Sequence, residues 1–231
     1  MKNLELLRGV TLFSRLTPDH LHLLGASLAK RSFARGETIF HQGSDGELLY
    51  LIVRGQVRIF TNSQLGQELS VKVFCDGEFF GELALLDGQP RSAGAQAMRA
   101  TTTVTLHRDA FRQAICASPE IALAVLEELS ARLRHTNIYA EHLASQSAPQ
   151  RVVRTLLDLA DQHGIAEQGA TRIDLHLTQD DLASLAGTTR ETVNRVLRGL
   201  RDQGLIQVER ARLSVLNLPQ LERRINRSTE C

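Results

Sequence analysis

Residues 178–200 read TQDDLASLAGTTRETVNRVLRGL, and this stretch decides how the C-terminal part of the chain folds. Thr178 can cap a helix, and Asp181 three residues later completes a capping box. Gly187 supplies a turn, after which Thr189 can cap a second helix. The pattern predicts a helix-turn-helix. Apolar residues recur on one face of each helix, at Leu182, Leu185 and Ala186 in the first and at Val193, Val196, Leu197 and Leu200 in the second.

The opposite face of the second helix is polar and basic. Arginine can donate two hydrogen bonds to guanine, and a carboxylate can accept one from cytosine. An ordinary solvent-exposed helix also carries such residues, but Arg190 and Glu191 stand at the N-terminal end, which enters the major groove in this motif. Residues 190–212 contain six arginines and three acidic residues, a local net charge of +3. The predicted DNA-binding residues are Thr178, Thr189, Arg190, Glu191, Asn194, Arg195 and Arg198.

The residues after this motif predict a β-hairpin. Residues 204–209 and 213–216 read as two short strands, with Arg210 and Arg212 near the tip between them. A hairpin in this position is a wing, which can contact phosphates and hold register without reading bases. The sequence therefore predicts a winged helix.

The N-terminal half has a different texture. Residues 38–111 are rich in glycine and contain short apolar runs separated by turn signals, which is typical of many short strands. Two strand-like stretches flank Gly55, and the second alternates apolar and polar residues over 56–59 with period two. An antiparallel barrel or roll is predicted, which makes the whole chain an α+β protein.

A long helix is predicted to follow, from Pro119 to about Ser145, because glycine is absent there. A roll covers only one side of such a helix, so the apolar seam along it predicts a homodimer; the alternative is that the seam packs on its own domain. Residues 145–149, SQSAP, read as a hinge before a second domain. The seam positions, at alternating spacings of three and four, are Leu126, Leu129, Leu133, Thr136, Ala140 and Leu143.

Residues 76–93 combine groups that suit an anion. Gly81 leaves backbone room beside a short helical turn whose free N–H groups favour a phosphate. Arg91 can donate to a phosphate in bidentate fashion, Ser92 adds a hydroxyl donor, and Glu82 can accept from a sugar hydroxyl. The structural alternative is a turn in which Glu82 and Arg91 form an ion pair.

Composition limits the remaining classes. The chain has 231 residues, 42% hydrophobic and 23% charged, with a net charge of +1, so any binding to a polyanion depends on a local patch. No apolar run approaches the roughly 20 residues of a bilayer span, and the charged start lacks a secretory signal, so we expect a cytoplasmic protein with no membrane partner. Three distant cysteines and scattered histidines predict neither disulfides nor a metal site.

The two motifs together carry a resemblance. The segments FGELALLDGQPRSA (80–93) and TTRETVNRVLRGL (188–200) resemble those of the cyclic AMP receptor protein and fumarate-nitrate regulator superfamily of bacterial transcription regulators, over residues 10–217. The resemblance implies a cyclic-nucleotide-binding β-roll sensor at 1–117, a dimerisation helix and hinge at 118–148, and a winged helix-turn-helix at 149–231. It implies no cofactor, the effector cyclic AMP, and double-stranded DNA and RNA polymerase as partners.

The resemblance also assigns roles to residues. Gly81 and Glu82 match the residues that hold the cyclic phosphate and the ribose 2′-hydroxyl. Leu83 lies in the same segment, residues 80–93, which we call the cassette. Arg91 and Ser92 match the residues that grip the phosphate. In the family, a threonine at the position of Thr136 meets the adenine amino group, and a polar residue at the position of Asn137 reaches the nucleotide of the other subunit. Thr136 could instead bond its own helix backbone. Lys72 stands where a smaller polar residue is expected near the base. This departure leaves open the choice between cyclic AMP, which the resemblance favours, and cyclic GMP.

Three alternatives stay open at this point. A regulator of the same architecture could respond to another effector or bind DNA constitutively. A nucleotide-processing enzyme would need a nucleophile or metal beside the cassette, and the sequence offers none. A pure interaction module would not need arginines positioned for a groove. The motif RETVNR, residues 190–195, resembles the family version that reads TGTGA half-sites in an inverted repeat.

Overall fold

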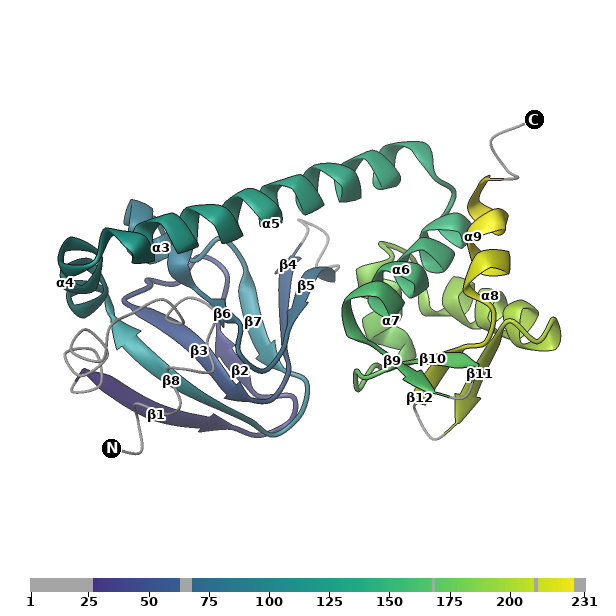
Figure 1. Cartoon of the computed structure of the whole chain (residues 1–231), viewed down its shortest axis with the longest axis horizontal. Coiled ribbons are helices and arrows are strands. Elements are labelled where there is room, and N and C mark those ends of the chain that lie inside the picture. The colour runs from purple at the N-terminus through teal and green to yellow at the C-terminus, as the bar shows by residue number, and fades with distance from the viewer. Residues whose placement is uncertain (1–26, 63–67, 168, 210–211, 227–231) are drawn as a thin grey trace. The chain divides into compact units, whose positions relative to one another are not determined.

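The computed structural model describes residues 27–62, 68–167, 169–209 and 212–226. The chain divides into two compact units, one ending at Thr136 and the other beginning at Asn137. The long helix α5 (Pro119–Ser145) contributes residues to both units (Figure 1).

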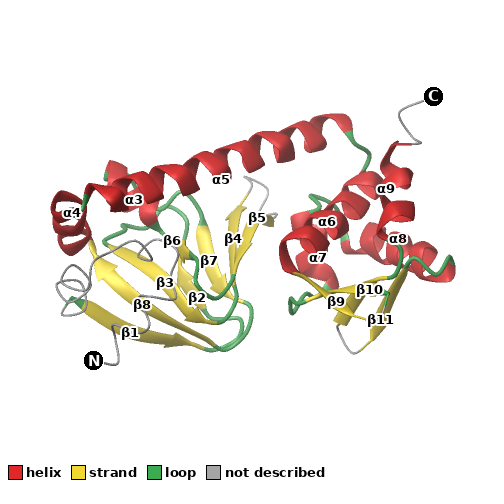
Figure 2. Cartoon of the chain, in the orientation of Figure 1, coloured by secondary structure: helices red, strands yellow, loops and turns green. Residues whose placement is uncertain are grey.

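The N-terminal unit is a β-roll, as predicted. It contains two four-stranded antiparallel sheets, with the strand orders β1-β8-β3-β6 and β2-β7-β4-β5 (Figure 2). The short helix α3 (Glu82–Asp87) and the helix α4 (Arg108–Ala117) accompany them. The strands are β1 (Leu28–Phe33), β2 (Thr38–Phe40), β3 (Leu48–Arg54), β4 (Val57–Asn62), β5 (Glu68–Phe74), β6 (Phe79–Phe80), β7 (Gly94–Ala97) and β8 (Thr101–His107).

Strand β3 is buried on both faces, which explains its nearly continuous apolar sequence. Leu49 and Leu51 belong to a core cluster with residues of α3, α4 and α5. Tyr50 and Ile52 point the other way, into a second cluster with residues of β4, β5 and β7. Side chains of both sheets meet in this second cluster, so β3 joins the roll to its covering helices.

The period-two pattern of β4 does not mark a solvent-facing side. Gln56 just before it and Arg58 within it are only 4% and 7% exposed. Arg58 is tolerated there because Nη2 donates to Glu68 Oε2 at 2.6 Å, and its guanidinium lies 4.7 Å from the centre of the Phe60 ring.

Helix α5 has the predicted bounds, and the structure divides the predicted seam. Leu129 packs on the core of its own unit, because it faces the same side of the helix as the buried Ile121 and Val125. Leu126 and Leu133 are 58% and 62% exposed. The intramolecular alternative therefore holds at Leu129 and fails at the two exposed leucines.

The C-terminal unit is a winged helix-turn-helix, as predicted. Its four-stranded sheet has the order β11-β12-β10-β9. Both predicted caps are present, because Thr178 accepts from the backbone N–H of Asp181 and Thr189 from that of Thr192. The elements are α6 (Ala148–His163), β9 (Gly164–Glu167), β10 (Ala170–Ile173), α7 (Gln179–Leu185), α8 (Arg190–Asp202), β11 (Ile206–Glu209), β12 (Arg212–Val215) and α9 (Leu218–Asn226).

The sequence patterns did not predict four elements of this unit and misplaced two side chains. Helix α6, strands β9 and β10 and helix α9 were not predicted; β9, GIAE, is exposed throughout and has no periodicity to detect. Leu185 and Val196, predicted on buried faces, are half-buried. The wing strands β11 and β12 are confirmed and include Arg212, whereas Arg210 lies outside the described residues.

We expect Leu156→Ala to lower the free energy of unfolding of the C-terminal unit by about 2–5 kcal/mol, because the side chain is fully buried and leaves a cavity. Leu216→Ala in the same unit is the matched control, because Leu216 is 37% exposed, and its cost should stay below about 1 kcal/mol. Urea unfolding of both variants measures the difference. Equal losses would contradict this account of the core.

Candidate functional site

The cassette begins with a tight turn at Gly81. Its φ of 83° and ψ of 11° are left-handed, and the residue precedes the first residue of α3. A Cβ there would lie 2.7 Å from Nη1 of Arg91, so glycine is required both by the backbone angle and by the guanidinium beside it.

Arg91 is buried in this turn. Only 5% of the residue's surface is exposed. Nη1 of Arg91 donates to the carbonyl of Gly81 at 2.6 Å, and Nη2 donates to the carbonyl of Leu48 at 2.7 Å. The guanidinium lies 4.3 Å from the centre of the Phe40 ring and 5.8 Å from that of Tyr50. These contacts fix the plane of the guanidinium.

Gly46 makes room for this guanidinium, a role that sequence reasoning missed. A Cβ at Gly46 would lie 2.6 Å from Arg91 Nε and 2.6 Å from the Cβ of Ala84. No local pattern in the sequence indicates this role, because the close approach joins residues 45 positions apart.

The charge of Arg91 is not neutralised by a neighbouring carboxylate. Across the described parts of the chain, no Asp or Glu oxygen lies within ion-pair distance of it, and Nε is buried without a hydrogen-bond partner. Burial lowers the pKa of the Arg91 guanidinium, and the more distant Tyr50 and Glu82 oppose this effect. A buried cation with unused donors is suited to an anionic ligand.

The alternative that Glu82 pairs with Arg91 is wrong. Glu82 is 4% exposed, and its Oε1 accepts instead from Nη1 of Arg132 on α5, at 2.8 Å. Arg132 also donates from Nη2 to the carbonyl of Phe79, at 2.7 Å. Sequence reasoning overlooked Arg132, because one arginine among several on a long helix gives no signal of a contact 50 residues away.

The other predicted nucleotide-binding residues are more accessible. Ser92 is exposed and Leu83 is 42% exposed. Thr136, four residues after Arg132 on α5, donates to the carbonyl of Arg132 at 2.9 Å, which is the backbone bond considered as its alternative role. Asn137 is exposed.

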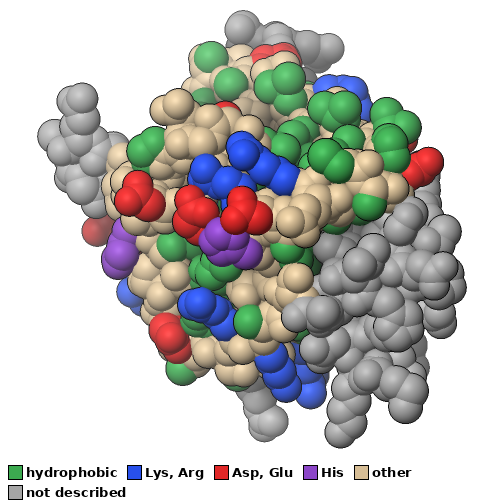
Figure 3. Space-filling view, turned by 90° about the vertical axis from the view of Figure 1, so that its left-hand side faces the viewer, with side chains coloured by type: hydrophobic (Ala, Val, Ile, Leu, Met, Phe, Trp, Pro, Cys, Tyr) green, Lys and Arg blue, Asp and Glu red, His purple; other side chains and the backbone are tan. Residues whose placement is uncertain are grey.

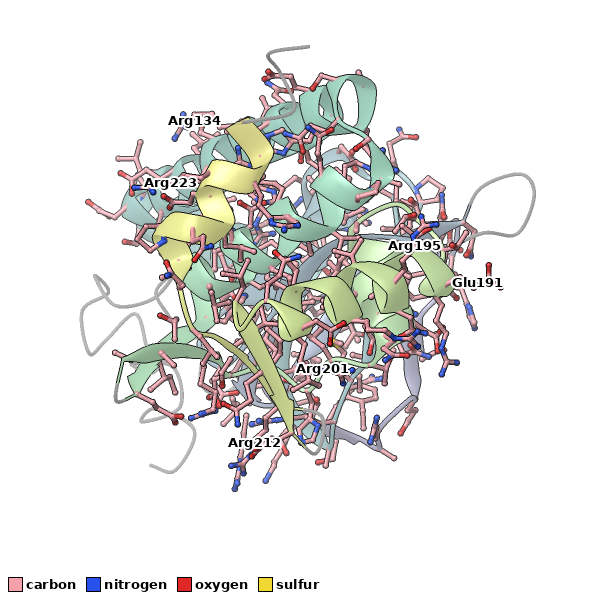
Figure 4. All side chains as sticks on the ribbon, turned by 90° about the vertical axis from the view of Figure 1, so that its right-hand side faces the viewer. Arg134, Glu191, Arg195, Arg201, Arg212 and Arg223 are labelled. Carbon is pink, nitrogen blue, oxygen red and sulfur yellow. The ribbon has the colours of Figure 1, made fainter. Side chains whose placement is uncertain are left out.

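The polar face of α8 is open to solvent. Arg190, Glu191, Arg195 and Arg198 are exposed, and Asn194 is half-buried. Arg190 Nη1 lies 3.3 Å from Asp180 Oδ2, an exposed pair that stabilises the fold little and can exchange for another acceptor. Figure 4 shows Glu191 and Arg195 near the N-terminal end of α8, with Arg212 on the wing.

Two residues from outside the helix-turn-helix hold its turn. The hydroxyl of Tyr139 donates to the carbonyl of Leu185 at 3.0 Å. Arg151 donates to the carbonyls of Ala186 at 2.9 Å and Gly187 at 2.7 Å. Burial raises the pKa of Tyr139, so its hydroxyl remains a donor. The carbonyls that α7 leaves free at its C-terminal end are thus satisfied.

One face of the N-terminal unit carries mixed charges. In Figure 3, which faces one side of the molecule, acidic, basic and histidine side chains lie intermixed and form no single basic patch.

Among the residues with assigned positions, no group of three His, Cys, Asp or Glu is placed to hold a metal ion. Within the same residues, no helix is both long and apolar enough to span a bilayer.

Two family models match the two units. Residues 30–117 match the cyclic nucleotide-binding domain, and residues 150–224 match the Crp-like helix-turn-helix domain. The fold and its two sites therefore define a transcription regulator with a nucleotide-binding sensor.

Relatives span nearly the whole chain. The CRP-like cAMP-activated global transcriptional regulator of Mycobacterium tuberculosis is 34% identical, over 95% of this chain and 98% of its own. The cyclic AMP receptor protein of Thermus thermophilus is 34% identical, over 94% and 97%. The chain belongs to the CRP/FNR superfamily of transcription regulators. The prediction of a regulator, and not an enzyme, is confirmed by these relatives.

Solved structures agree with the fold. The c-di-GMP responsive global regulator CLP of Xanthomonas campestris is 25% identical with a TM-score of 0.75, covering 87% of this chain and all of that one. The catabolite activator protein of Thermus thermophilus is 33% identical with a TM-score of 0.53, covering 94% and 98%.

We expect Gly46→Ala to destabilise the N-terminal unit by about 1–3 kcal/mol, because the new Cβ overlaps Arg91 and Ala84. Gly199→Ala is the matched control with the opposite sign. Gly199 lies inside α8 with nothing within 4 Å of a new Cβ, so alanine should stabilise that helix by about 0.5–1 kcal/mol. Thermal unfolding followed by calorimetry separates the two, and a neutral Gly46→Ala would refute the close packing.

Proposed function

We propose that this regulator is a homodimer whose affinity for DNA is controlled by a cyclic nucleotide, with cyclic AMP preferred over cyclic GMP. The observation that carries the proposal is the buried Arg91 guanidinium, which has unused donors and no carboxylate partner within the described residues. This arginine stands in the domain that matches the cyclic nucleotide-binding model.

The phosphate is proposed to bind at Arg91, Ser92 and the backbone of Gly81. Two of the five guanidinium N–H donors already bond carbonyl oxygens, which fixes the group and leaves three for an anion. Ser92, the next residue after Arg91 in the sequence, is exposed and offers its hydroxyl as a further donor. A monoanionic cyclic phosphate would neutralise the buried cation, whereas a neutral ligand would not.

The sugar and base are proposed to lie toward α3 and α5. Glu82 supplies an acceptor for a ribose hydroxyl, and Leu83 presents an apolar side chain beside it. Thr136 is proposed to contact the purine, exchanging its backbone bond for that contact, and Asn137 is proposed to reach the nucleotide bound by the other subunit. Cyclic AMP is favoured because the relatives named above include a cAMP-activated regulator and a cyclic AMP receptor protein.

The homodimer is proposed from the exposed leucines of α5. Leu123, Leu126 and Leu133 are 58%, 58% and 62% exposed on one helix. Burying a leucine side chain contributes about 1.5–3 kcal/mol, so a second copy of α5 packed on this face would be stabilised. A dimer also explains how one protein reads an inverted repeat.

DNA is proposed to bind at the N-terminal half of α8. Arg190 and Arg195 are assigned to guanines and Glu191 to a cytosine of a TGTGA half-site, while Asn194, Arg198 and the caps Thr178 and Thr189 contact the backbone or neighbouring bases. Two such helices must lie about 34 Å apart to enter successive major grooves. The cytoplasm, where chromosomal DNA lies, is the proposed location, and RNA polymerase is the proposed protein partner.

We expect cyclic AMP to raise the affinity for a TGTGA inverted repeat about 5- to 150-fold at about 100 mM salt, the usual range of allosteric coupling. Arg91→Ala should abolish this increase, and Arg31→Ala, an exposed arginine of the same unit, should not. Fluorescence anisotropy measures the DNA affinity of the wild-type protein and of both variants with cyclic AMP, with cyclic GMP and without nucleotide. Equal affinity in every condition would instead favour constitutive binding or another effector.

We expect Arg190→Ala to cost about 1–3 kcal/mol of binding to the same site and to relax one base position, because a bidentate contact to guanine is lost. Arg223→Ala on α9 is the control, since Figure 4 shows it on a different element from α8. Selection from a randomised half-site reads out the preference. A uniform loss over all sequences would mean that Arg190 contacts only phosphate.

A further inference from the structure

A series of alternating charges runs from strand β5 of the roll to the cassette. Two of its members, Lys72 and Glu128, have no role in the proposed site. Lys72 on β5 lies 3.7 Å from Glu128 Oε1, and Glu128 Oε1 accepts from Arg132 Nε at 2.8 Å. Arg132 in turn bonds Glu82. The four side chains come from β5, α5 and α3, so they contact one another only when the unit is folded.

Each of the three guanidinium nitrogens of Arg132 donates a hydrogen bond. Nε bonds Glu128, Nη1 bonds Glu82 and Nη2 bonds the carbonyl of Phe79. Its guanidinium also lies 4.5 Å from the centre of the Phe74 ring and 4.7 Å from that of Phe79. Three donor directions in one plane leave the group a single orientation, and Glu128 is the partner that fixes its Nε edge.

This orientation acts on only one oxygen of Glu82. Arg132 donates to Oε1, and among the residues described in the structure Oε2 has no hydrogen-bond partner. A carboxylate has about four acceptor positions, so Oε2 is left to accept from a ligand. Because the side chain is only 5% exposed, an incoming hydroxyl is a better partner for Oε2 than bulk water.

Lys72 is the member of this series of charges that lies farthest from Glu82 in the order of contacts. Its Nζ lies 3.3 Å from Glu78 Oε1 as well as near Glu128, and 4.7 Å from the centre of the Phe74 ring. Burial alone would raise the pKa of Glu128, but Arg132 and Lys72 outweigh it and hold that pKa below its ordinary value. Glu128 thus stays ionised as the acceptor that Arg132 requires.

We propose that Lys72 and Glu128 are positioning residues of the nucleotide site, which act through Arg132 to aim Glu82 Oε2 at the ribose 2′-hydroxyl. They thereby set the preference for a ribonucleotide over its 2′-deoxy analogue. This inference rests on the proposed binding of a cyclic nucleotide. Neither residue touches the ligand in this account.

A purely structural pair would behave differently. Lys72 and Glu128 have side chains 28% and 35% exposed, and ion pairs this accessible stabilise a fold by only about 0–1 kcal/mol. Loss of a structural pair would weaken the binding of every nucleotide equally. Loss of a positioning pair weakens only the contact between Glu82 and the ribose 2′-hydroxyl. It therefore changes the ratio of the affinities for cyclic AMP and for 2′-deoxy cyclic AMP.

The experiment is calorimetric titration of the full chain with cyclic AMP and with 2′-deoxy cyclic AMP. A charge-assisted hydrogen bond corresponds to a factor of about 10–100, so the wild-type protein should prefer cyclic AMP by that factor. Glu128→Ala should reduce this ratio at least about threefold, and Lys72→Met should reduce it less, in the same direction. Glu128→Gln, whose amide oxygen can still accept from Nε, should lie closer to wild type than Glu128→Ala.

Two matched controls carry the same substitutions elsewhere. Lys30→Met changes an exposed lysine of β1, and Glu141→Ala changes an exposed glutamate of α5; both should keep the wild-type ratio. A Glu128→Ala protein that binds both nucleotides more weakly at an unchanged ratio overturns the inference alone. A wild-type protein that binds neither nucleotide overturns the proposed function itself. Lys72→Met, at a partly exposed position, keeps the test decisive if Glu128→Ala does not fold.

Discussion

A guanidinium can be withdrawn from water only where acceptors and aromatic faces surround it, and two such groups, the buried Arg91 and the half-buried Arg132, hold the cassette of the N-terminal unit. Arg91 bonds the carbonyl of Gly81, and Arg132 bonds the side chain of Glu82, so the first two residues of the cassette are held by two different arginines. Gly46 and Gly81 exist as glycines because the Arg91 guanidinium occupies the space of a side chain. Because Arg132 belongs to α5, this helix bonds Glu82 directly.

The C-terminal unit meets an equivalent demand with backbone carbonyls. A helix leaves its last carbonyls without partners, and here the end of α7 is also the turn that sets the direction of α8. Tyr139 on α5 and Arg151 on α6 satisfy these carbonyls at Leu185, Ala186 and Gly187. Helix α5 thus supplies one contact to the cassette, through Arg132, and one to the DNA-reading motif, through Tyr139, within a single continuous helix.

Much of the fold was predictable because its signals are local. Caps at Thr178 and Thr189, the glycine turn and the apolar spacing lie within a few residues of one another. The caps and the turn were confirmed, and the spacing was confirmed except at the half-buried Leu185 and Val196. The partner of Glu82 was not predictable, because Arg132 stands 50 residues away. The seam on α5 was predicted only in part, because its period fits both Leu129, which packs inward, and Leu133, which does not. Periodicity gives the faces of a helix, but neighbours decide which face is covered.

By itself the sequence determined the architecture, the two motifs and the residue types suited to a cyclic phosphate and to DNA, since hydrophobic period, capping and turn chemistry act over one or two turns of chain. The tertiary structure alone decided which charges meet: that Arg91 has no carboxylate partner among the described residues, that Glu82 pairs with Arg132, and that Lys72 reaches Glu128. Electrostatic contacts depend on distances of a few ångströms between groups far apart in the chain, and only folding sets those distances.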